Sequence, residues 1–256
     1  MPLCRRAFLN LVAGSVATGL MTSTPLALAA TTPPIKAIAF DAFPIFDPRP
    51  ILARAEALFP GQGAELSNAW RTRQFEYTWL RTVSQHYADF WQVTEDALVF
   101  AGNMLKLDLS REKRQHLMAA YLELKAWPDV LPALRSLREA GLRLAFLSNF
   151  TPRMLEAAIR SAGLEGLFEH LLSTDQVKTY KPDPRAYQMG LEALRLNREA
   201  IVFVAFAGWD AAGAKWFGYP TFWVNRLNLP VEELGIAPDA TGGNLADLVN
   251  VLRSQR

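Results

Sequence analysis

The stretch from Lys36 to Asp47, Lys-Ala-Ile-Ala-Phe-Asp-Ala-Phe-Pro-Ile-Phe-Asp, constrains the fold of this chain more than any other segment. Residues 35–40 are apolar apart from Lys36 and show no alternation of polar and apolar side chains, which is typical of a strand covered on both faces in a parallel sheet. The run ends at Asp41. Open α/β sheets bind ligands at the carboxyl ends of their strands, so Asp41 is a candidate for binding or attacking a ligand. The alternative is that Asp41 only caps the following turn.

The first thirty residues differ in composition from the rest. Arg5-Arg6 is followed by Phe-Leu, no further charge occurs before Lys36, and residues 11–20 are apolar or small. This pattern predicts a signal peptide over residues 1–30, of the twin-arginine type, with cleavage near Ala29 or Ala30 and a periplasmic or exported protein. The apolar run is too short and too interrupted for a stable membrane span, although an uncleaved anchor is the alternative.

The composition excludes several classes of function. A chain of 256 residues, 50% hydrophobic and 20% charged, can form one large domain or a core with an inserted domain. The net charge is +2 and no basic patch carries interleaved aromatics, so we expect no nucleic-acid partner. The single cysteine, Cys4, lies in the predicted leader, and the remaining chain would have no disulfide, thiol nucleophile or cysteine metal site.

Two kinds of pattern follow the first strand. Apolar residues recur at helical spacing from Ile51 to about Lys125 without a strand signal, which predicts an inserted helical cap over residues 49–126. Its helices are expected at residues 51–59, 66–87, 94–105 and 110–124. From residue 127 helices and strands alternate, which predicts an α/β fold with a parallel, Rossmann-like core formed by residues 31–48 and 127–256. Strands are expected at residues 142–147, 170–173, 200–206 and 221–224, and helices at 130–140, 152–162, 184–194, 211–217 and 244–252.

Polar residues gather where the predicted strands end. Asp41 follows the first strand, Ser148-Asn149 the second, and Trp209-Asp210 a later one, while Lys181 lies in the loop after the strand at 170–173. Each is weak evidence alone, because Ser-Asn is a common turn and Lys-Pro-Asp a common helix entry. Because parallel strands end at one edge of the sheet, we expect these groups to converge into a site.

The same residues resemble the haloacid dehalogenase superfamily. The resemblance becomes closer to the type II (S)-2-haloacid dehalogenases when the cap segment Trp70-Arg-Thr-Arg-Gln-Phe-Glu-Tyr-Thr-Trp-Leu80 is included. Tyr180-Lys-Pro-Asp-Pro-Arg-Ala-Tyr187, Trp209-Asp-Ala-Ala-Gly-Ala-Lys215 and Trp223-Val-Asn-Arg226 are similar to that subfamily as well. The resemblance covers nearly all of residues 36–252.

The resemblance implies a covalent mechanism without metal or cofactor. Asp41 would displace the halide from C2 of a short (S)-2-haloacid, and water would hydrolyse the resulting ester to the (R)-2-hydroxy acid. Lys181 would hold Asp41 ionised and positioned. Asp210 would help to activate the water.

Further residues acquire binding roles through the resemblance. Arg71 from the cap would receive the halide together with Asn149, and Ser148 would bind the substrate carboxylate. We expect Phe43, Trp209 and Tyr187 to line the substrate or halide site, with Tyr187 supporting Lys181. The alternatives are that Arg71 is a solvated arginine paired with Glu76 or another neighbour, and that the aromatic residues only pack.

Three motifs depart from the family pattern. The usual Asp-x-Tyr-Gly-Thr-Leu-Phe-Asp is one residue shorter here, with Phe43 in place of tyrosine and Pro44 in place of Gly-Thr. The usual Ser-Ser-Asn-Ala-Trp-Asp reads Ala205-Phe-Ala-Gly-Trp-Asp210, and Ser-Asn-Gly reads Ser148-Asn-Phe150. We therefore expect a more apolar site in which displacement is retained and ester hydrolysis is the step most affected.

Two other functions remain open from the sequence. A magnesium-dependent phosphatase of the same superfamily would carry a second aspartate two residues after the nucleophile, where Phe43 stands, and more oxygen ligands near the last motif. An exported binding protein without catalytic activity would explain the lost hydroxyl and amide groups. A homodimer formed through helical surfaces is a further expectation from the resemblance.

Overall fold

The strand expected before Asp41 is β1 (Ala37–Phe40), and all four of its residues are buried. A computed structural model describes residues 34–254, so the predicted signal peptide, its cleavage site and Cys4 lie outside the described residues. Strand β1 lies between β4 and β6 in a six-stranded sheet of order β5-β4-β1-β6-β7-β8, in which every neighbouring pair is parallel. The other strands are β4 (Arg143–Ser148), β5 (His170–Ser173), β6 (Ile201–Ala205), β7 (Thr221–Val224) and β8 (Ala240–Gly242).

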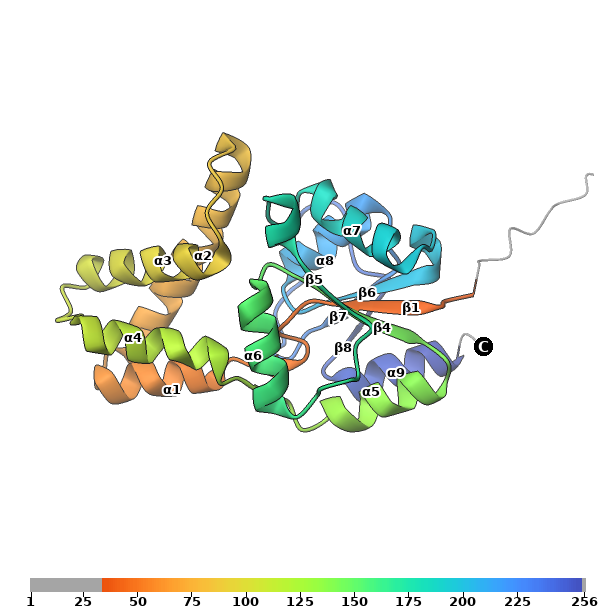
Figure 1. Ribbon diagram of the computed structural model, residues 1–256, viewed down its shortest axis with the longest axis horizontal. Coiled ribbons are helices and arrows are strands. Elements are labelled where there is room, and N and C mark those ends of the chain that lie inside the picture. The colour runs from red at the N-terminus through yellow and green to blue at the C-terminus, as the bar shows by residue number, and fades with distance from the viewer. Residues whose placement is uncertain (1–33, 255–256) are drawn as a thin grey trace, which may run out of the picture. The chain divides into compact units, whose positions relative to one another are not determined.

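Helices cover both faces of the sheet, as Figure 1 shows. Ile38 and Phe40 of β1 face the core shared with α5 (Val130–Glu139), α6 (Pro152–Ala162) and α9 (Leu245–Ser254). Ala37 and Ala39 face the opposite core, formed with α7 (Pro184–Leu194) and α8 (Gly208–Phe217). The predicted α/β fold with a parallel, Rossmann-like core is therefore confirmed. Two short 3-10 helices, η2 (Thr174–Val177) and η3 (Arg198–Ala200), lie in connections of this layered core.

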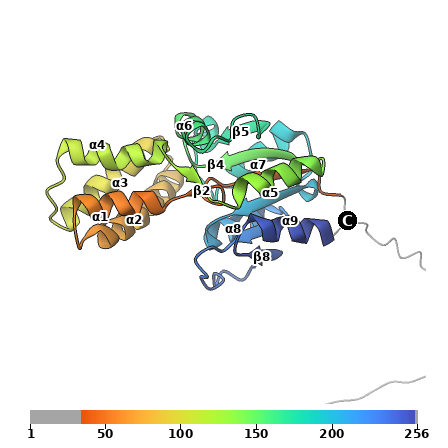
Figure 2. The ribbon, with the colours of Figure 1, turned by 90° about the horizontal axis from the view of Figure 1, so that it is seen from below.

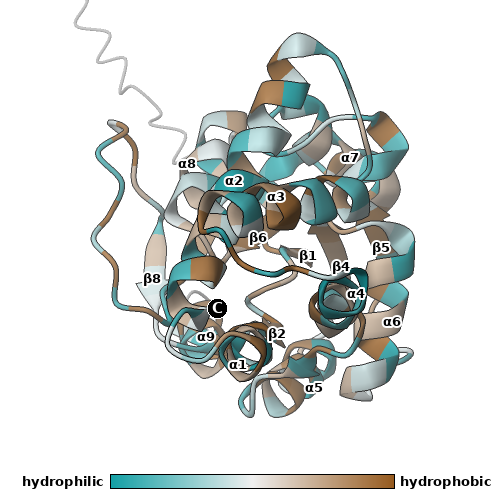
Figure 3. Ribbon diagram, turned by 90° about the vertical axis from the view of Figure 1, so that its left-hand side faces the viewer, coloured by the Kyte–Doolittle hydropathy of each residue, from teal (hydrophilic) through white to brown (hydrophobic). Residues whose placement is uncertain are grey.

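The segment between β1 and α5 is mainly helical. It contains α1 (Arg49–Leu58), α2 (Gly63–Ser84), α3 (Phe90–Met104), α4 (Arg111–Ala119) and the 3-10 helix η1 (Ala120–Leu122). In Figure 3 the exposed α4 is mostly hydrophilic and α3 is more hydrophobic, which agrees with the many buried residues of α3. Among the described residues, no helix is long and apolar enough to cross a membrane.

A small antiparallel sheet joins this helical segment to the core. Strand β2 (Phe46–Asp47) pairs with β3 (Lys125–Ala126), so the chain leaves and returns at adjacent points. Figure 2 shows α1 to α4 on one side of this connection and the six-stranded sheet on the other. The expectation of helix up to about Lys125 is wrong at its end, because β3 lies there. Two residues are too few to show a strand periodicity.

Some element boundaries differ from those expected. Helix α3 begins at Phe90 rather than Thr94, because the Asp89 carboxylate caps it by accepting from the Gln92 backbone N–H at 2.9 Å. Helix α8 begins at Gly208 rather than Ala211. Strand β8 was not expected, and its three residues carry no apolar alternation.

Candidate active site

Asp41 lies where β1 ends and lines a cavity between the sheet and the cap helices. Its backbone N–H still donates to the Val204 carbonyl of β6 at 3.0 Å, which fixes its backbone to the sheet. Its side chain is 15% exposed, so the carboxylate reaches the cavity while most of it is enclosed. Oδ1 accepts a hydrogen bond from Lys181 Nζ at 2.8 Å, and the Phe43 backbone N–H lies 3.4 Å from Oδ2.

Lys181 connects two carboxylates. Its Nζ donates to Asp41 and also to Asp210 Oδ2 at 2.5 Å, and the side chain is 2% exposed. Burial alone would lower the pKa of Lys181, but the negative charges of Asp210 and Asp41 outweigh burial, and the pKa is raised. Lys181 is therefore a cation at neutral pH, shared between the two acids.

Asn149 positions the loop that carries Lys181. Its Oδ1 accepts from the Lys181 backbone N–H at 3.1 Å and from the Thr174 hydroxyl at 3.3 Å. Its Nδ2 has no acceptor among residues 34–254, and the residue lines the cavity. The side chain thus holds the lysine loop through its oxygen and offers its amide N–H groups to a ligand.

Asp210 is buried in the first turn of α8. Burial raises its pKa to about 6, and the nearby charge of Asp41 acts in the same direction, against the opposing effects of Lys181 and Tyr187. The Tyr187 hydroxyl donates to Asp210 Oδ1 at 2.7 Å. A carboxylate with a pKa close to neutrality can take up a proton during a reaction.

Tyr187 does not line the cavity, which corrects the expectation that it contacts substrate or halide and supports Lys181. It is fully buried behind the site, and its hydroxyl binds Asp210 instead. A Cβ atom at Gly213 would lie 2.5 Å from this hydroxyl and 2.6 Å from Pro182 Cβ, so the close approach of α8 requires glycine. Tyr187 therefore acts on the site through Asp210.

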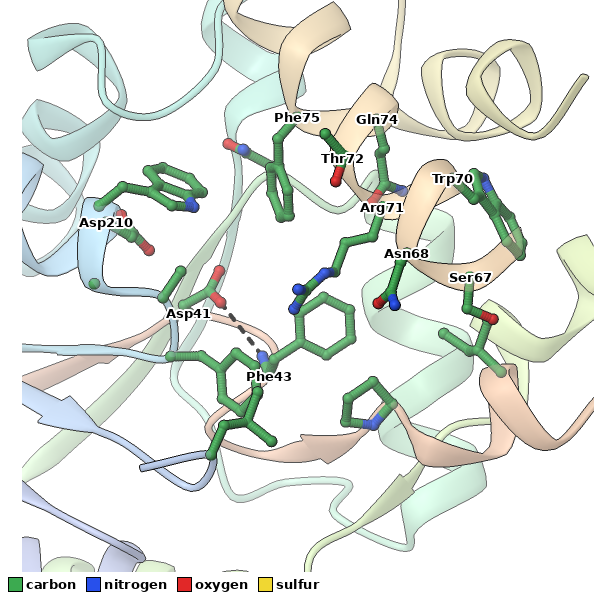
Figure 4. Close-up of a pocket in the computed structure, with 18 of the residues that line it drawn as sticks. Asp41, Phe43, Ser67, Asn68, Trp70, Arg71, Thr72, Gln74, Phe75 and Asp210 are labelled. Atoms are coloured by element: carbon green, nitrogen blue, oxygen red, sulfur yellow. Dashed lines mark hydrogen bonds between the residues drawn. The ribbon is translucent and has the colours of Figure 1, made fainter. Parts of the chain in front are cut away.

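Arg71 projects from α2 into the cavity. Figure 4 shows its guanidinium group reaching toward Asp41 and Phe43. No residue in the described part of the chain forms a hydrogen bond or ion pair with the Arg71 side chain. The alternative pairing with Glu76 is not observed, because Glu76 pairs with Arg73 at 3.0 Å. Arg71 is thus a cation available to an anion in the cavity.

The remaining predicted residues line the cavity walls. Ser148 is buried, and its Oγ accepts from the Phe150 backbone N–H at 3.2 Å, so its own hydrogen is not required by that bond. The ring of Phe43 meets Phe150 edge to face at 5.4 Å. Trp209 packs similarly against the cap residue Phe75 at 5.2 Å.

The cavity has a volume of about 630 Å³ and brings together eight of the nine predicted residues. The connection from β6 into α8 contributes Phe206, Ala207 and Gly208 to it, so this wall is as apolar as the sequence predicts. Sequence reasoning missed the cap residues Gln74 and Tyr121, which also line it. The one available signal was that Gln74 lies three residues after Arg71, which places both on one helix face.

The short loop after Asp41 is held by hydrogen bonds that other residues donate to its backbone carbonyl groups. Trp127 Nε1 donates to the Phe43 carbonyl at 3.1 Å, and Arg226 Nη2 donates to the Pro44 carbonyl at 3.0 Å. Arg226 in turn forms a bidentate ion pair with Asp129, in which Nη1 donates to Oδ1 and Nη2 to Oδ2, both at 2.9 Å. Residues from the cap connection and from the segment after β7 therefore hold the shortened loop in place.

A second contact joins cap and core beside the lysine loop. The hydroxyl of Tyr87, from the turn between α2 and α3, donates to Asp175 Oδ1 at 2.7 Å. Tyr180, next to Lys181 in the chain, donates to the Ala88 carbonyl, and the two tyrosine rings stack at 5.4 Å. This tyrosine pair thus attaches the cap to the core in addition to its β2–β3 connection.

Comparisons with known proteins agree with this geometry. A family model described as haloacid dehalogenase-like hydrolase matches residues 7–218. The chain is 47% identical over 206 residues to an (S)-2-haloacid dehalogenase of Pseudomonas sp. (strain YL), which covers 80% of this chain and 89% of the relative. It is 42% identical over 208 residues to haloacetate dehalogenase H-2 of Moraxella sp. (strain B), covering 81% and 93% of the two chains.

Solved structures match as well. The L-2-haloacid dehalogenase RSc1362 has a TM-score of 0.85 at 46% identity, covering 86% of this chain and 100% of the other. The L-2-haloacid dehalogenase of Xanthobacter autotrophicus with chloropropionic acid covalently bound has a TM-score of 0.81 at 32% identity, covering 87% and 100%. The chain described here therefore belongs to the haloacid dehalogenase-like hydrolases.

Proposed function

We propose that the protein hydrolyses the carbon–halogen bond of short (S)-2-haloacids and releases the (R)-2-hydroxy acid and halide. The observation that carries this proposal is the group formed by Asp41, Lys181 and Asp210, which opens into a cavity that also contains the unpaired Arg71. Relatives that carry the name (S)-2-haloacid dehalogenase and a related structure with covalently bound chloropropionic acid support it.

In the first step Asp41 attacks C2 of the substrate. Because Lys181 holds Oδ1, and Oδ2 accepts only the long bond from the Phe43 backbone N–H at 3.4 Å, Oδ2 is the oxygen that attacks. The new C–O bond forms as the C–X bond breaks, and the bonding electron pair leaves with the halide, so the configuration at C2 inverts. Arg71 and the Asn149 amide are placed to receive the halide, and the Ser148 hydroxyl can donate to the substrate carboxylate.

In the second step water attacks the carbonyl carbon of the Asp41 ester. Its proton passes to the Asp210 carboxylate, whose pKa of about 6 suits this role near neutral pH. The ammonium group of Lys181, 2.8 Å from Oδ1, stabilises the negative charge that develops on this oxygen. The ester C–O bond then breaks, and the proton held by Asp210 passes to the departing oxygen, which gives the hydroxy acid and restores the Asp210 carboxylate. One oxygen of Asp41 leaves with the product, and one from water replaces it.

The two other candidate functions fit the site less well. In a phosphatase the two carboxylates would bind a divalent cation, but here the Lys181 ammonium lies between them, 2.8 Å from one and 2.5 Å from the other. Within residues 34–254, no three His, Cys, Asp or Glu side chains are grouped to hold a metal ion. A non-catalytic binding protein would not require a lysine that orients an acid in the cavity.

One assay separates the three functions. The protein is incubated with (S)-2-chloropropionate, with and without chelator, while chloride release and the intact mass are followed. Chelator-resistant turnover that is lost in Asp41→Asn supports the dehalogenase, and a stable mass adduct without turnover indicates stalled ester hydrolysis. Activity restricted to phosphate esters with magnesium ions would refute the proposal, and the absence of any reaction would favour a binding protein.

We further propose that the protein is exported through its twin-arginine-type leader and that it forms a homodimer. The paired residues Arg5-Arg6 support export, and cell fractionation of the wild type and of an Arg5→Lys/Arg6→Lys variant would test it. The exposed Leu80 and Val83 of α2, 61% and 85% accessible, support an interface on this helix. Sedimentation of wild type and Val83→Glu would test dimer formation.

A further inference from the structure

Tyr121 carries a hydroxyl group in the cavity wall that none of the predicted roles uses. It belongs to η1, at the end of the cap, and is 4% exposed. Its ring packs edge-on against Trp70 at 5.6 Å and against Phe150 at 6.1 Å, which fixes the ring between the cap and the core. The residue lines the same cavity as Asp41 and Arg71.

The direction of the neighbouring hydrogen bonds determines what this hydroxyl can do. Thr94 Oγ1 donates its only hydrogen to the Phe90 carbonyl at 2.5 Å. Thr94 Oγ1 can therefore only accept a hydrogen bond from the Gln74 side chain. The Gln74 atom that faces it at 2.6 Å must then be the amide nitrogen, Nε2. The same nitrogen lies 3.3 Å from Tyr121 Oη. Tyr121 therefore accepts this hydrogen bond and keeps its own hydrogen.

No acceptor for that hydrogen is found among residues 34–254. The nearby cation is Arg71, whose charge acts on the Tyr121 hydroxyl, and Arg71 likewise has no partner in the described part of the chain. Burial raises the pKa of Tyr121 to about 12, so the hydroxyl remains a donor throughout the working pH range. The cap therefore presents two unused donors to the same cavity, and the chemistry they fit is an anion.

We propose that Tyr121 Oη donates a hydrogen bond to the departing halide, beside Arg71, and is a further catalytic residue of this enzyme. This inference rests on the proposed dehalogenation. As the C–X bond breaks, the electron pair moves onto the halogen, and a donor aimed at it stabilises the developing charge. No proton is transferred, so the tyrosine is unchanged at the end of the step.

Tyr121→Phe tests this assignment because it removes only the hydroxyl. We expect inhibition by free chloride to weaken and kcat/KM for (S)-2-chloropropionate to fall by about ten- to hundredfold, the range for a lost hydrogen bond to a charged group. For (S)-2-bromopropionate kcat/KM should fall less, since bromide is a better leaving group than chloride. Tyr77→Phe is the matched control: Tyr77 lies on α2 and does not line the cavity, and its ring packs against Phe100 and Arg73.

A purely structural role would give a different result. It would lower the thermal unfolding temperature of Tyr121→Phe without changing chloride inhibition or the chloride-to-bromide rate ratio, and this outcome would overturn the inference. Should the variant not fold, a crystal structure of the wild type with bromide, located by anomalous scattering, decides the matter. Bromide in contact with both Tyr121 Oη and Arg71 supports the proposal, and bromide bound elsewhere refutes it. A wild-type protein without dehalogenase activity would instead refute the proposed function.

Discussion

Replacing Lys181 by methionine should separate the electrostatic role of this residue from its packing. Methionine is of similar length and apolar, so it fills the buried space but leaves the carboxylates of Asp41 and Asp210 without their shared cation. Both oxygens lie within 2.8 Å of the same nitrogen, so they are less than twice that distance apart. Two like charges at about 5 Å repel by about 3 kcal/mol at an effective dielectric constant of about 20.

The expected loss of stability depends on pH. At pH 8 the free energy of unfolding should fall by about 3–5 kcal/mol, as for other buried ion pairs that lose one partner. The charge of Lys181 lowers the pKa of Asp210, which is about 6 in the wild type, so this pKa should rise further in the variant. At pH 5 Asp210 is then protonated, the repulsion is gone, and only the cost of unmade hydrogen bonds remains, about 1–3 kcal/mol.

Urea denaturation at pH 5 and pH 8 measures this difference, and Lys178→Met is the matched control. Lys178 lies in the same loop, its side chain is 62% exposed, and it pairs with Asp175 at 2.8 Å. An exposed pair of this kind contributes about 0–1 kcal/mol, with little change between these pH values. A loss below about 1 kcal/mol for Lys181→Met at pH 8, or a loss that does not shrink on acidification, would refute the reasoning.

Other predictions follow from the site. The rate of ester hydrolysis should fall about tenfold per pH unit below about pH 6, because protonated Asp210 cannot take the proton of water. A hydrolysis rate that stays constant from pH 5 to pH 8 would contradict this role. Tyr187→Phe removes a hydrogen bond that lowers the pKa of Asp210, so the acid limb should move up by about one pH unit. Arg71→Met should change the free energy of unfolding by less than about 0.5 kcal/mol yet lower kcat/KM at least about hundredfold. The control Arg73→Met should retain activity. Equal losses of activity in both variants would exclude a specific role for Arg71. Gly213→Ala should destabilise the protein by about 1–3 kcal/mol, measured by urea denaturation, because its methyl group would overlap the Tyr187 hydroxyl, and a neutral effect would show that α8 can shift.

The layered core could be predicted because its central strands β4, β1 and β6 are continuous apolar runs. Strand β1 is followed by Asp41 and β4 ends at Ser148, and parallel pairing places such ends at one edge whatever the intervening loops do. Gly163 illustrates a local signal of the same kind: it ends α6 with a φ of 66°, as glycine does at many helix ends.

The contacts within the site could not be predicted in the same way. Whether the Tyr187 hydroxyl reaches Lys181 or Asp210 depends on the packing of α7 against α8 to within a few ångströms, which no sequence pattern records. Tyr121 is separated from Arg71 by fifty residues, and their common cavity exists only because η1 folds back against α2. The Trp127–Phe43 bond likewise joins residues whose proximity depends on the β2–β3 connection.

The second attachment of the cap bears on how substrate reaches Asp41. Swinging the cap away about the β2–β3 connection would break the Tyr87 and Tyr180 hydrogen bonds and separate their stacked rings. At about 1 kcal/mol for each of these contacts, fewer than about one molecule in a hundred would be open at a time. The cavity already has an exposed rim at Leu227 and Leu229, which are 52% and 51% accessible. An approach of small haloacids past this rim would not require the cap to swing away.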